Sequence, residues 1–417
     1  MSRARLAATV LAVVAPLLVL PGAAVARDCP DPVAADNAIV LEVSTGEVAC
    51  ERRADARRPV GSAVKLMTAL LTLERADLEA KFRASSYRPA MFESQIGLLP
   101  GERMTVRDLL KGLLAESGND AAMALAEGVS GSERAFVRQM NRRARQLDLD
   151  NTRYRNPIGL DEPGAYSSAR DLVKLATYLR TKPFFRRTVN QTEVTLTSGD
   201  HTRRFDNRND LLHSQRWVNG VKTGHTRGAG YVLVGSARRD GVQVVSAVLG
   251  TPSEAARDAD SLRLLTYGRR AFQRITAARA GSSVGVSIPI RYGRGAELEL
   301  VVGPNGERTV VRRGNRDSVT VEPTSYPSEV QGPIAYGQEL GQADVLQDGR
   351  KIATVALVAR TEVPAPDLAQ RTKSWFTQPL AVVLAFAVLS GTVLVARRRR
   401  RPRGPGPERA REEARTA

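Results

Sequence analysis

Hydrophobic positions recur at helical spacing through the first half of the chain, after a hairpin-like pair of short strands at 38–43 and 47–52. Apolar residues from Val64 to Leu73 lie on one helical face. The same spacing predicts four further helices, at 106–114, 121–127, 134–147 and 168–180. The period then changes to that of strands at 217–222, 230–237 and 242–249, before a last helix over 253–274. This order predicts an α+β domain with helices packed on an antiparallel sheet.

A second pattern begins at about Gly281, where apolar and polar residues alternate along several short stretches. Val284 to Ile290 alternates, 298–302 does so again, and Asp348-Gly349 is typical of a tight hairpin turn. We therefore expect a small all-β sandwich over 281–362, without a catalytic constellation of its own. A proline-rich linker, 363–374, follows it.

Both ends of the chain carry membrane-related signals. Residues 1–26 combine a basic start, a short apolar core and a small-residue ending, which predicts a signal peptide cut after Ala26. Residues 375–396 are apolar, begin with two aromatic residues and precede five arginines, which predicts a transmembrane helix with the tail 397–417 in the cytoplasm. The bulk of the protein would then face the cell wall, anchored by a single pass through the cell membrane.

The net charge of +18 falls to +10 when the two ends, which hold +2 and +6, are set aside. A basic surface of that size suits an anionic wall polymer or lipid headgroups, or is simply solvated, and no motif indicates nucleic acid. Cys29 and Cys50 are the only cysteines, and an oxidising compartment favours a bridge between them. With three histidines besides, the chain offers little material for a thiol protease or a metal site.

The first candidate for chemistry is Ser62-Ala63-Val64-Lys65, at the start of the first long helix. Residues three apart share a helix face, so the Lys65 amine can reach the Ser62 hydroxyl and act as its base. A lysine base needs a lowered pKa, which burial or a second cation such as Lys222 would supply. The chain has only eight lysines against 54 arginines, and two of the eight fall in these motifs.

Two further motifs follow in order. Ser117 and Asn119 fall in a break between helices, where they would relay a proton and hold the substrate, or merely cap a helix. Lys222-Thr223-Gly224 ends a predicted strand, where it would bind an extended peptide and its carboxylate; an ordinary strand with a bulge is the alternative.

These three motifs resemble those of the penicillin-binding D-alanyl-D-alanine carboxypeptidases, in the penicillin-recognising serine hydrolase superfamily. The resemblance runs from about 33 to 275, and the β-rich part to about 360 is similar to the family's C-terminal domain. The blocks that carry it are Pro59–Thr68, Ser117–Ala122, Asn156–Leu160, Tyr166–Asp171 and Gly220–Thr226. It implies a β-lactamase/transpeptidase-like catalytic domain over 27–275.

The resemblance also implies the reaction. Ser62 would attack the bond between the last two D-alanines of a peptidoglycan stem peptide, and β-lactam antibiotics would acylate it as covalent inhibitors. The backbone N–H groups of Ser62 and His225 would form the oxyanion hole. Arg257, with Thr223, would bind the terminal carboxylate; a surface arginine on a helix is the alternative for Arg257. No metal or organic cofactor is implied.

Three other functions stay open at this level. A β-lactamase shares the motifs but adds a deacylating glutamate, for which Glu162 is the candidate, although its neighbours do not resemble that loop. A wall endopeptidase or transpeptidase would use the same residues on a different substrate. A non-catalytic, penicillin-sensing wall receptor would use the β domain as its binding module, although the intact Ser62, Lys65 and Lys222 argue against it. Two departures from the family pattern are the spanning helix in place of an amphipathic anchor, and Gly61 where alanine is common.

Overall fold

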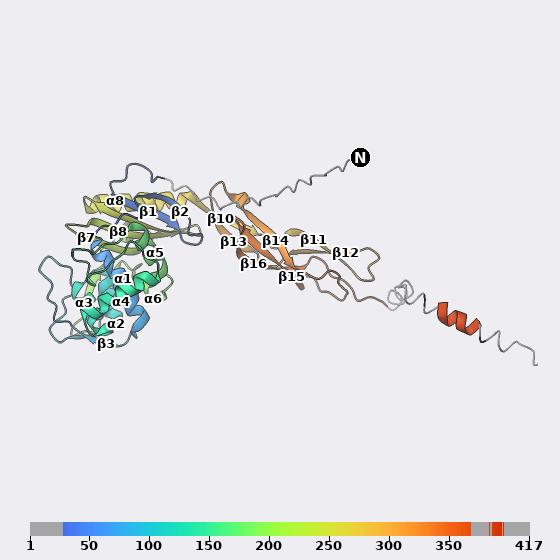
Figure 1. Cartoon of the computed structure of the whole chain (residues 1–417), viewed down its shortest axis with the longest axis horizontal. Coiled ribbons are helices and arrows are strands. Elements are labelled where there is room, and N and C mark those ends of the chain that lie inside the picture. The colour runs from blue at the N-terminus through green and yellow to red at the C-terminus, as the bar shows by residue number, and fades with distance from the viewer. Residues whose placement is uncertain (1–27, 368–382, 384–385, 394, 396–417) are drawn as a thin grey trace, which may run out of the picture. The chain divides into compact units, whose positions relative to one another are not determined.

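The computed structural model describes residues 28–367, 383, 386–393 and 395. The predicted signal peptide 1–26, the tail 397–417 and most of the predicted spanning segment lie outside the described residues. The chain divides into two compact units (Figure 1). The first contains residues up to Arg274 together with Val310–Gly314, and the second contains 275–309 and the residues from 315 onward.

The first unit is built on a five-stranded antiparallel sheet in the order β2-β1-β9-β8-β7. Its strands are β1 (Asn37–Glu42), β2 (Val48–Arg52), β7 (Val218–Thr226), β8 (Gly230–Arg239) and β9 (Val242–Thr251). Asp240 and Gly241, with φ of 53° and 81°, make the two-residue turn between β8 and β9. The predicted hairpin and the three consecutive strands are therefore confirmed.

Helices cover both faces of this sheet. They are α1 (Lys65–Arg75), α2 (Val106–Ala115), α3 (Asn119–Ser130), α4 (Glu133–Gln146), α5 (Ala169–Leu179), α6 (Pro183–Thr188), α7 (Leu211–Ser214) and α8 (Glu254–Ala271). Alternate strand residues enter two cores: Val232 and Val234 pack with α1 to α5, whereas Leu233 packs with Leu264 of α8. Ser168 caps α5 by accepting from the backbone N–H of Asp171.

Some elements differ from the prediction. The last helix ends at Ala271, and Phe272–Ala278 continues as strand β10, which pairs with β13 (Glu307–Arg312). Two short hairpins were not predicted, β3 (Lys81–Arg83) with β4 (Arg103–Thr105) and β5 (Glu193–Leu196) with β6 (Arg203–Asp206). Strands of three or four residues are too short to establish a period of two.

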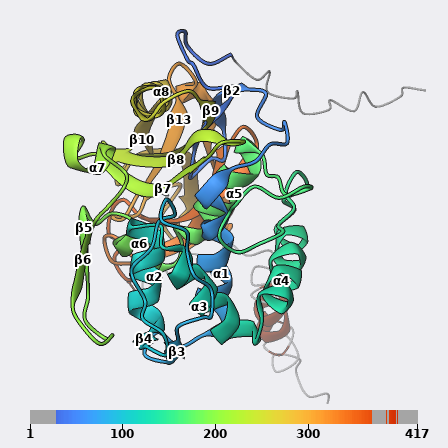
Figure 2. The ribbon, with the colours of Figure 1, turned by 90° about the vertical axis from the view of Figure 1, so that its left-hand side faces the viewer.

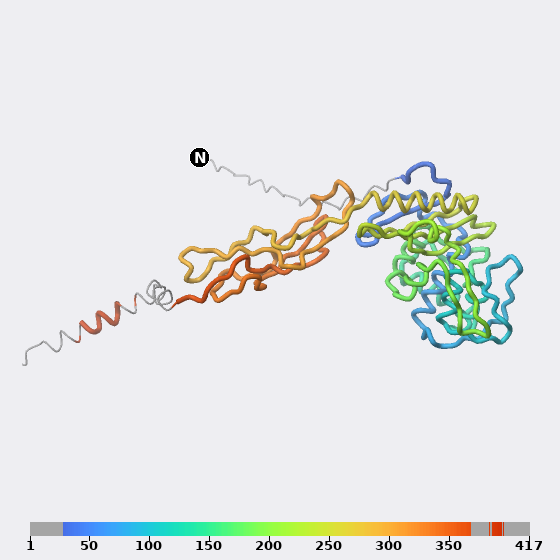
Figure 3. The backbone as a smooth tube through the Cα atoms, turned by 180° about the vertical axis from the view of Figure 1, so that it is seen from behind, coloured from blue at the N-terminus to red at the C-terminus, as the bar shows by residue number. Residues whose placement is uncertain are grey.

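The second unit is all-β, as the alternation predicts. One antiparallel sheet runs in the order β11-β12-β16-β15-β14, and its edge strands β11 and β14 come into contact. These strands belong to the orange part of the tube in Figure 3. The strands of this sheet surround one apolar core, which also contains Ala278 of β10, a strand of the separate two-stranded sheet β10–β13. Its strands are β11 (Ser283–Pro289), β12 (Glu297–Val302), β14 (Val319–Ser325), β15 (Glu339–Gln347) and β16 (Arg350–Ala359), with a short 3-10 turn η2 (Arg316–Ser318) before β14.

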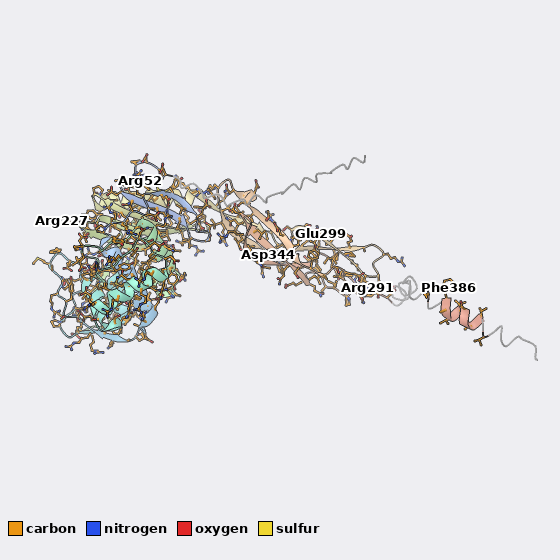
Figure 4. The ribbon with its side chains drawn as sticks, in the orientation of Figure 1. Arg52, Arg227, Arg291, Glu299, Asp344 and Phe386 are labelled. Carbon is orange, nitrogen blue, oxygen red and sulfur yellow. A yellow bond between two sulfur atoms is a disulfide. The ribbon has the colours of Figure 1, made fainter. Side chains whose placement is uncertain are left out.

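Several ion pairs lie on the surface of this unit. Glu299 pairs with Arg360 at 2.6 Å and Asp344 with Lys351 at 2.7 Å. The two carboxylate residues are labelled in Figure 4. No described cluster of histidine, cysteine, aspartate and glutamate in either unit is arranged to hold a metal ion.

Within the described residues, no helix is long and apolar enough to cross a membrane. Residues 386–393, inside the predicted spanning segment, are helical, and the side chain of Phe386 is exposed (Figure 4). At the other end of the described chain, Cys29 and Cys50 form a disulfide.

Candidate active site

Ser62 lies in a 3-10 turn, η1 (Gly61–Val64), that leads directly into α1. Lys65 is the first residue of α1 and is wholly buried. Its Nζ donates to Ser62 Oγ over 2.8 Å and to the backbone carbonyl of Ile158 over 2.7 Å. The three-residue spacing therefore brings an amine against the serine hydroxyl, as predicted, and the loop that carries Ile158 holds that amine in place.

Electrostatics favour the neutral form of this amine. Burial lowers the pKa of Lys65 well below its usual value, and the nearby positive charge of Lys222 lowers it further. The carboxylates of Glu93 and Asp120 act in the opposite direction. A neutral amine has a free lone pair, so the lowered pKa makes Lys65 better able to accept the proton of Ser62.

The strand β7 contacts η1, the 3-10 turn before α1; β7 and α1 are labelled in Figure 2. A Cβ on Gly224 would lie 2.7 Å from the carbonyl oxygen of Val60 and 3.1 Å from the backbone nitrogen of Ser62, so only glycine fits. A Cβ on Gly61, which has φ of +55°, would lie 2.9 Å from the backbone nitrogen of His225. The N–H groups of Ser62 and His225 thus belong to two backbones in close contact.

The side chain of His225 itself is exposed and stacks on Tyr231, with ring centroids 4.1 Å apart. Lys222, two strand positions before Gly224, is buried, and its Nζ donates to the Thr223 carbonyl over 3.1 Å. Burial and the positive charge of Arg208 lower the pKa of Lys222 to about 7. Lys222 and Lys65 therefore form a pair of buried amines whose charges repel each other.

Ser117 lies between α2 and α3 with φ of 70°, a left-handed conformation that is uncommon for a residue with a side chain. Its Oγ is buried and has no hydrogen-bond partner among the described residues. A native structure seldom buries an unsatisfied hydroxyl, and a strained backbone is typical of functional sites. Both features fit a hydroxyl that bonds to a substrate.

Asn119 is the first residue of α3, whose N-cap is Gly118, and its side chain does not cap the helix. Its Nδ2 instead donates to Glu93 Oε2 over 2.5 Å. Glu93 also accepts from the hydroxyl of Tyr87, and these bonds hold its pKa below the usual value although burial opposes them. The amide is therefore held by the loop between β3 and β4.

Arg257 belongs to α8 and is 2% exposed, so the alternative of a surface arginine is wrong. It forms ion pairs with Asp258 at 2.8 Å, Glu254 at 3.2 Å and Asp210 at 3.8 Å. Its positive charge lowers the pKa of Lys222, which shows that it lies near the third motif. Its role in binding a substrate carboxylate stays a prediction.

Two charged residues near the site were not identified from the amino-acid sequence. Arg208 pairs with Glu116 at 2.5 Å, and its charge acts on both buried lysines. Glu93 is the carboxylate that holds Asn119. Both lie in stretches without regular periodicity, so only the folded chain brings them to the motifs. The lactamase candidate Glu162, by contrast, is exposed and close enough to Glu133 to raise its pKa.

A serine on a helix N-terminus, a buried lysine against it and a glycine-bearing strand alongside define an acyl-transferring serine hydrolase of the penicillin-recognising class. Residues 24–253 match the family described as D-alanyl-D-alanine carboxypeptidase, and 272–365 match the domain described as penicillin-binding protein 5, C-terminal domain. This chain belongs to the D-alanyl-D-alanine carboxypeptidase family.

Individual relatives agree with this assignment. D-alanyl-D-alanine carboxypeptidase DacF of Bacillus subtilis (strain 168) is 31% identical over 335 residues, which is 79% of this chain and 86% of that protein. Penicillin binding protein 5 from Haemophilus influenzae has a solved structure that matches with a TM-score of 0.59 and 28% identity, over 80% of this chain and 99% of that one. The Streptomyces K15 DD-transpeptidase matches with a TM-score of 0.55 and 34% identity, over 58% and 98%.

Proposed function

We propose that this protein is a serine carboxypeptidase that removes the terminal D-alanine from peptidoglycan stem peptides ending in D-Ala-D-Ala, and that penicillin acylates it at Ser62. The observation that carries the proposal is the 2.8 Å hydrogen bond between Lys65 Nζ and Ser62 Oγ, with the lysine wholly buried. Family membership supplies the substrate class.

In the acylation step, Lys65 takes the proton of Ser62 as Oγ attacks the carbonyl carbon of the penultimate D-alanine. The carbonyl oxygen becomes an oxyanion, which the N–H groups of Ser62 and His225 stabilise. The C–N bond then breaks, and the leaving amine receives the proton from Lys65 through the Ser117 hydroxyl. Free D-alanine departs, and the rest of the peptide stays esterified to Ser62.

In the deacylation step, a water molecule attacks the ester carbonyl while Lys65 takes one of its protons. The second tetrahedral intermediate collapses and the proton returns to Ser62 Oγ. Lys222, Thr223 and Arg257 bind the substrate's terminal carboxylate, which explains why cations gather at this end of the site. Penicillin follows the first step, and its opened ring stays attached because no leaving group departs.

The test is release of D-alanine from a peptide ending in D-Ala-D-Ala by the full-length chain in non-ionic detergent. Wild-type protein should release D-alanine, and Ser62→Ala should reduce the rate to background. Ser214→Ala, a change at an exposed serine of α7, is the matched control and should keep full activity. Release by Ser62→Ala at the wild-type rate would refute the nucleophile; no release by any form would refute the activity.

Transfer of the acyl group to an amine is a second candidate, favoured by the match to the Streptomyces K15 DD-transpeptidase. An acceptor such as glycylglycine, added at high concentration, would compete with water for the same acyl-enzyme. A new peptide bond to the acceptor, in place of free acid, would assign transpeptidation. Free acid alone would assign the carboxypeptidase.

The chain is proposed to be exported and anchored by residues 375–396, with both units outside the cell membrane and facing the wall. The support is the apolar run and the arginine block behind it, together with the exposed apolar helix at 386–393. A chain cut after Ser374 should leave the membrane fraction and remain active. Continued membrane retention of the shortened chain would contradict a single spanning anchor.

A further inference from the structure

A broad groove on the first unit has arginine side chains on both of its walls. The groove has a volume of about 970 Å³, and none of the three catalytic motifs contributes to its lining. One wall is α4, where Phe136, Met140 and Ala144 are buried in the core. The arginines of α4 that line the groove lie on another stripe of the helix, at Arg134, Arg138, Arg142 and Arg145.

The opposite wall is the extended segment after α4. Arg153 and Arg155 line the groove and are exposed, while Tyr154 between them is 2% exposed. Alternation along an extended chain therefore directs both arginines to the same side. Arg153 is fixed by backbone bonds to Tyr166, so this wall is held by structure and not only by its side chains.

These six arginines have no ion-pair partner within 4 Å in the part of the chain that the structure describes. The neighbouring Arg143, on a different stripe of α4, does pair, with Glu74 at 2.7 Å. Three carboxylates also line the groove, those of Glu133, Asp150 and Glu162, so the lining has a net charge of +3. Burial and the negative charges of Glu162 and Glu127 raise the pKa of Glu133.

Spacing decides which anion suits such a groove. Arg134, Arg138 and Arg142 are four residues apart, and a helical rise of about 1.5 Å per residue places them about 6 Å apart along the axis. A row of charges of this kind matches a ligand that repeats its anionic groups along a line. The row also lies inside a concave groove, which favours a narrow chain over a flat bilayer surface.

We propose that this groove binds a linear polyanion, with phosphate or carboxylate groups repeated along its backbone. Guanidinium groups bind both anions in bidentate geometry, and each bound anion relieves the repulsion among the unpaired arginines. The inference concerns a surface that the acyl-transfer chemistry does not use. It therefore stands or falls independently of the carboxypeptidase activity.

The test measures binding of the full-length chain, in non-ionic detergent, to poly(glycerol phosphate) and in parallel to polygalacturonate, at several salt concentrations. The variant replaces Arg138, Arg142 and Arg145 by glutamine. Its affinity should fall by at least about tenfold, and the slope of log affinity against log salt should fall by about 2 to 3. The two polymers distinguish phosphate from carboxylate as the preferred group.

A matched control removes the same charge elsewhere on the first unit, by Arg75→Gln, Arg187→Gln and Arg216→Gln. All three control positions are exposed. The control should lose less than about threefold in affinity, because general attraction by net charge is weak and screened by salt. Equal losses in the two triple variants would show attraction by net charge alone and would overturn the proposal.

Folding and ligand type need their own readouts. D-alanine release by the groove variant should match that of wild type, which shows that the fold is intact. If the variant is unstable, Arg153→Gln with Arg155→Gln tests the opposite wall. Soluble glycerophosphoglycerol, the headgroup of an anionic lipid, should compete poorly with poly(glycerol phosphate) for the groove at equal phosphate concentration. Competition as strong as that of the polymer would mean a single-anion or lipid site and would overturn the proposal.

Discussion

Replacing Gly224 by alanine tests the close approach of β7 to the serine turn. The new Cβ would lie 2.7 Å from the carbonyl oxygen of Val60 and 3.0 Å from the backbone nitrogen of Ala63. Ordinary contact begins at 3.4 Å, so the two backbones must separate by about 0.7 Å. All of the atoms in contact are backbone atoms, so no side chain can rotate away to absorb this.

That separation moves the His225 N–H away from the oxyanion. A misplacement of about 1 Å reduces the rate about 100-fold, and loss of one oxyanion donor has a similar effect. We therefore expect Gly224→Ala to lower the rate constant for acylation by fluorescent penicillin about 100-fold, or about 2.7 kcal/mol in transition-state stabilisation. The same factor should apply to kcat/KM for D-alanine release, with thermal unfolding showing a folded protein.

Gly235→Ala is the control, because Gly235 lies opposite Val221 of β7 in the same sheet. Its new Cβ would meet only side chains, first Ser246 Oγ at 3.0 Å, and a rotamer change can absorb that contact. The control should acylate within about threefold of wild type, since the backbone beside Ser62 stays in place. Acylation of Gly224→Ala at the wild-type rate would refute the argument that this contact sets the geometry of the site.

Three other perturbations have defined outcomes. Lys222→Gln removes a positive charge that lowers the pKa of Lys65, so the pKa of Lys65 should rise. The acylation rate increases with pH as Lys65 loses its proton, and the acid limb of the pH–rate profile should therefore move to higher pH. A shift to lower pH would contradict the repulsion between the two lysines. Glu102→Gln breaks an ion pair between Glu102 and Arg203, whose side chains are 0% and 4% exposed, so urea unfolding at pH 7 should show a loss of about 3–5 kcal/mol in the free energy of unfolding. Arg203 holds the pKa of Glu102 low although burial opposes it, so this loss should shrink as pH falls through that pKa. A loss that stays constant with pH would argue against the ion pair. Replacing both disulfide cysteines by serine opens a loop with a sequence separation of 21 and should reduce the free energy of unfolding by about 3 kcal/mol, with unchanged stability as the contrary result.

The parts of the site that were predictable from sequence follow local geometry. The contact of Lys65 with Ser62 follows from their three-residue spacing at a helix start. The absence of a Cβ at Gly224, which the close approach requires, follows from the residue type alone. The long helices and the β7–β9 strands were predictable for the same reason, because their apolar period extends over many residues.

The parts that were not predictable depend on the assembled fold. The link between Glu93 and Asn119 joins residues 26 positions apart, and Arg208 reaches the two lysines from an irregular segment after β6. Nothing local in the sequence distinguishes this glutamate or this arginine from others on the surface. Of the three carboxylates around Arg257, Glu254 and Asp258 lie in α8 itself, whereas Asp210 precedes α7 and reaches the arginine only in the folded chain.

The most direct test of the central claim is the location of the covalent adduct formed with penicillin. The full-length chain is labelled, digested with protease and analysed by mass spectrometry, and the modified peptide is sequenced. The account predicts one adduct per chain, on the oxygen of Ser62, and none in Ser62→Ala. An adduct on Ser117 or on any other residue, or an unlabelled wild-type protein, would contradict it.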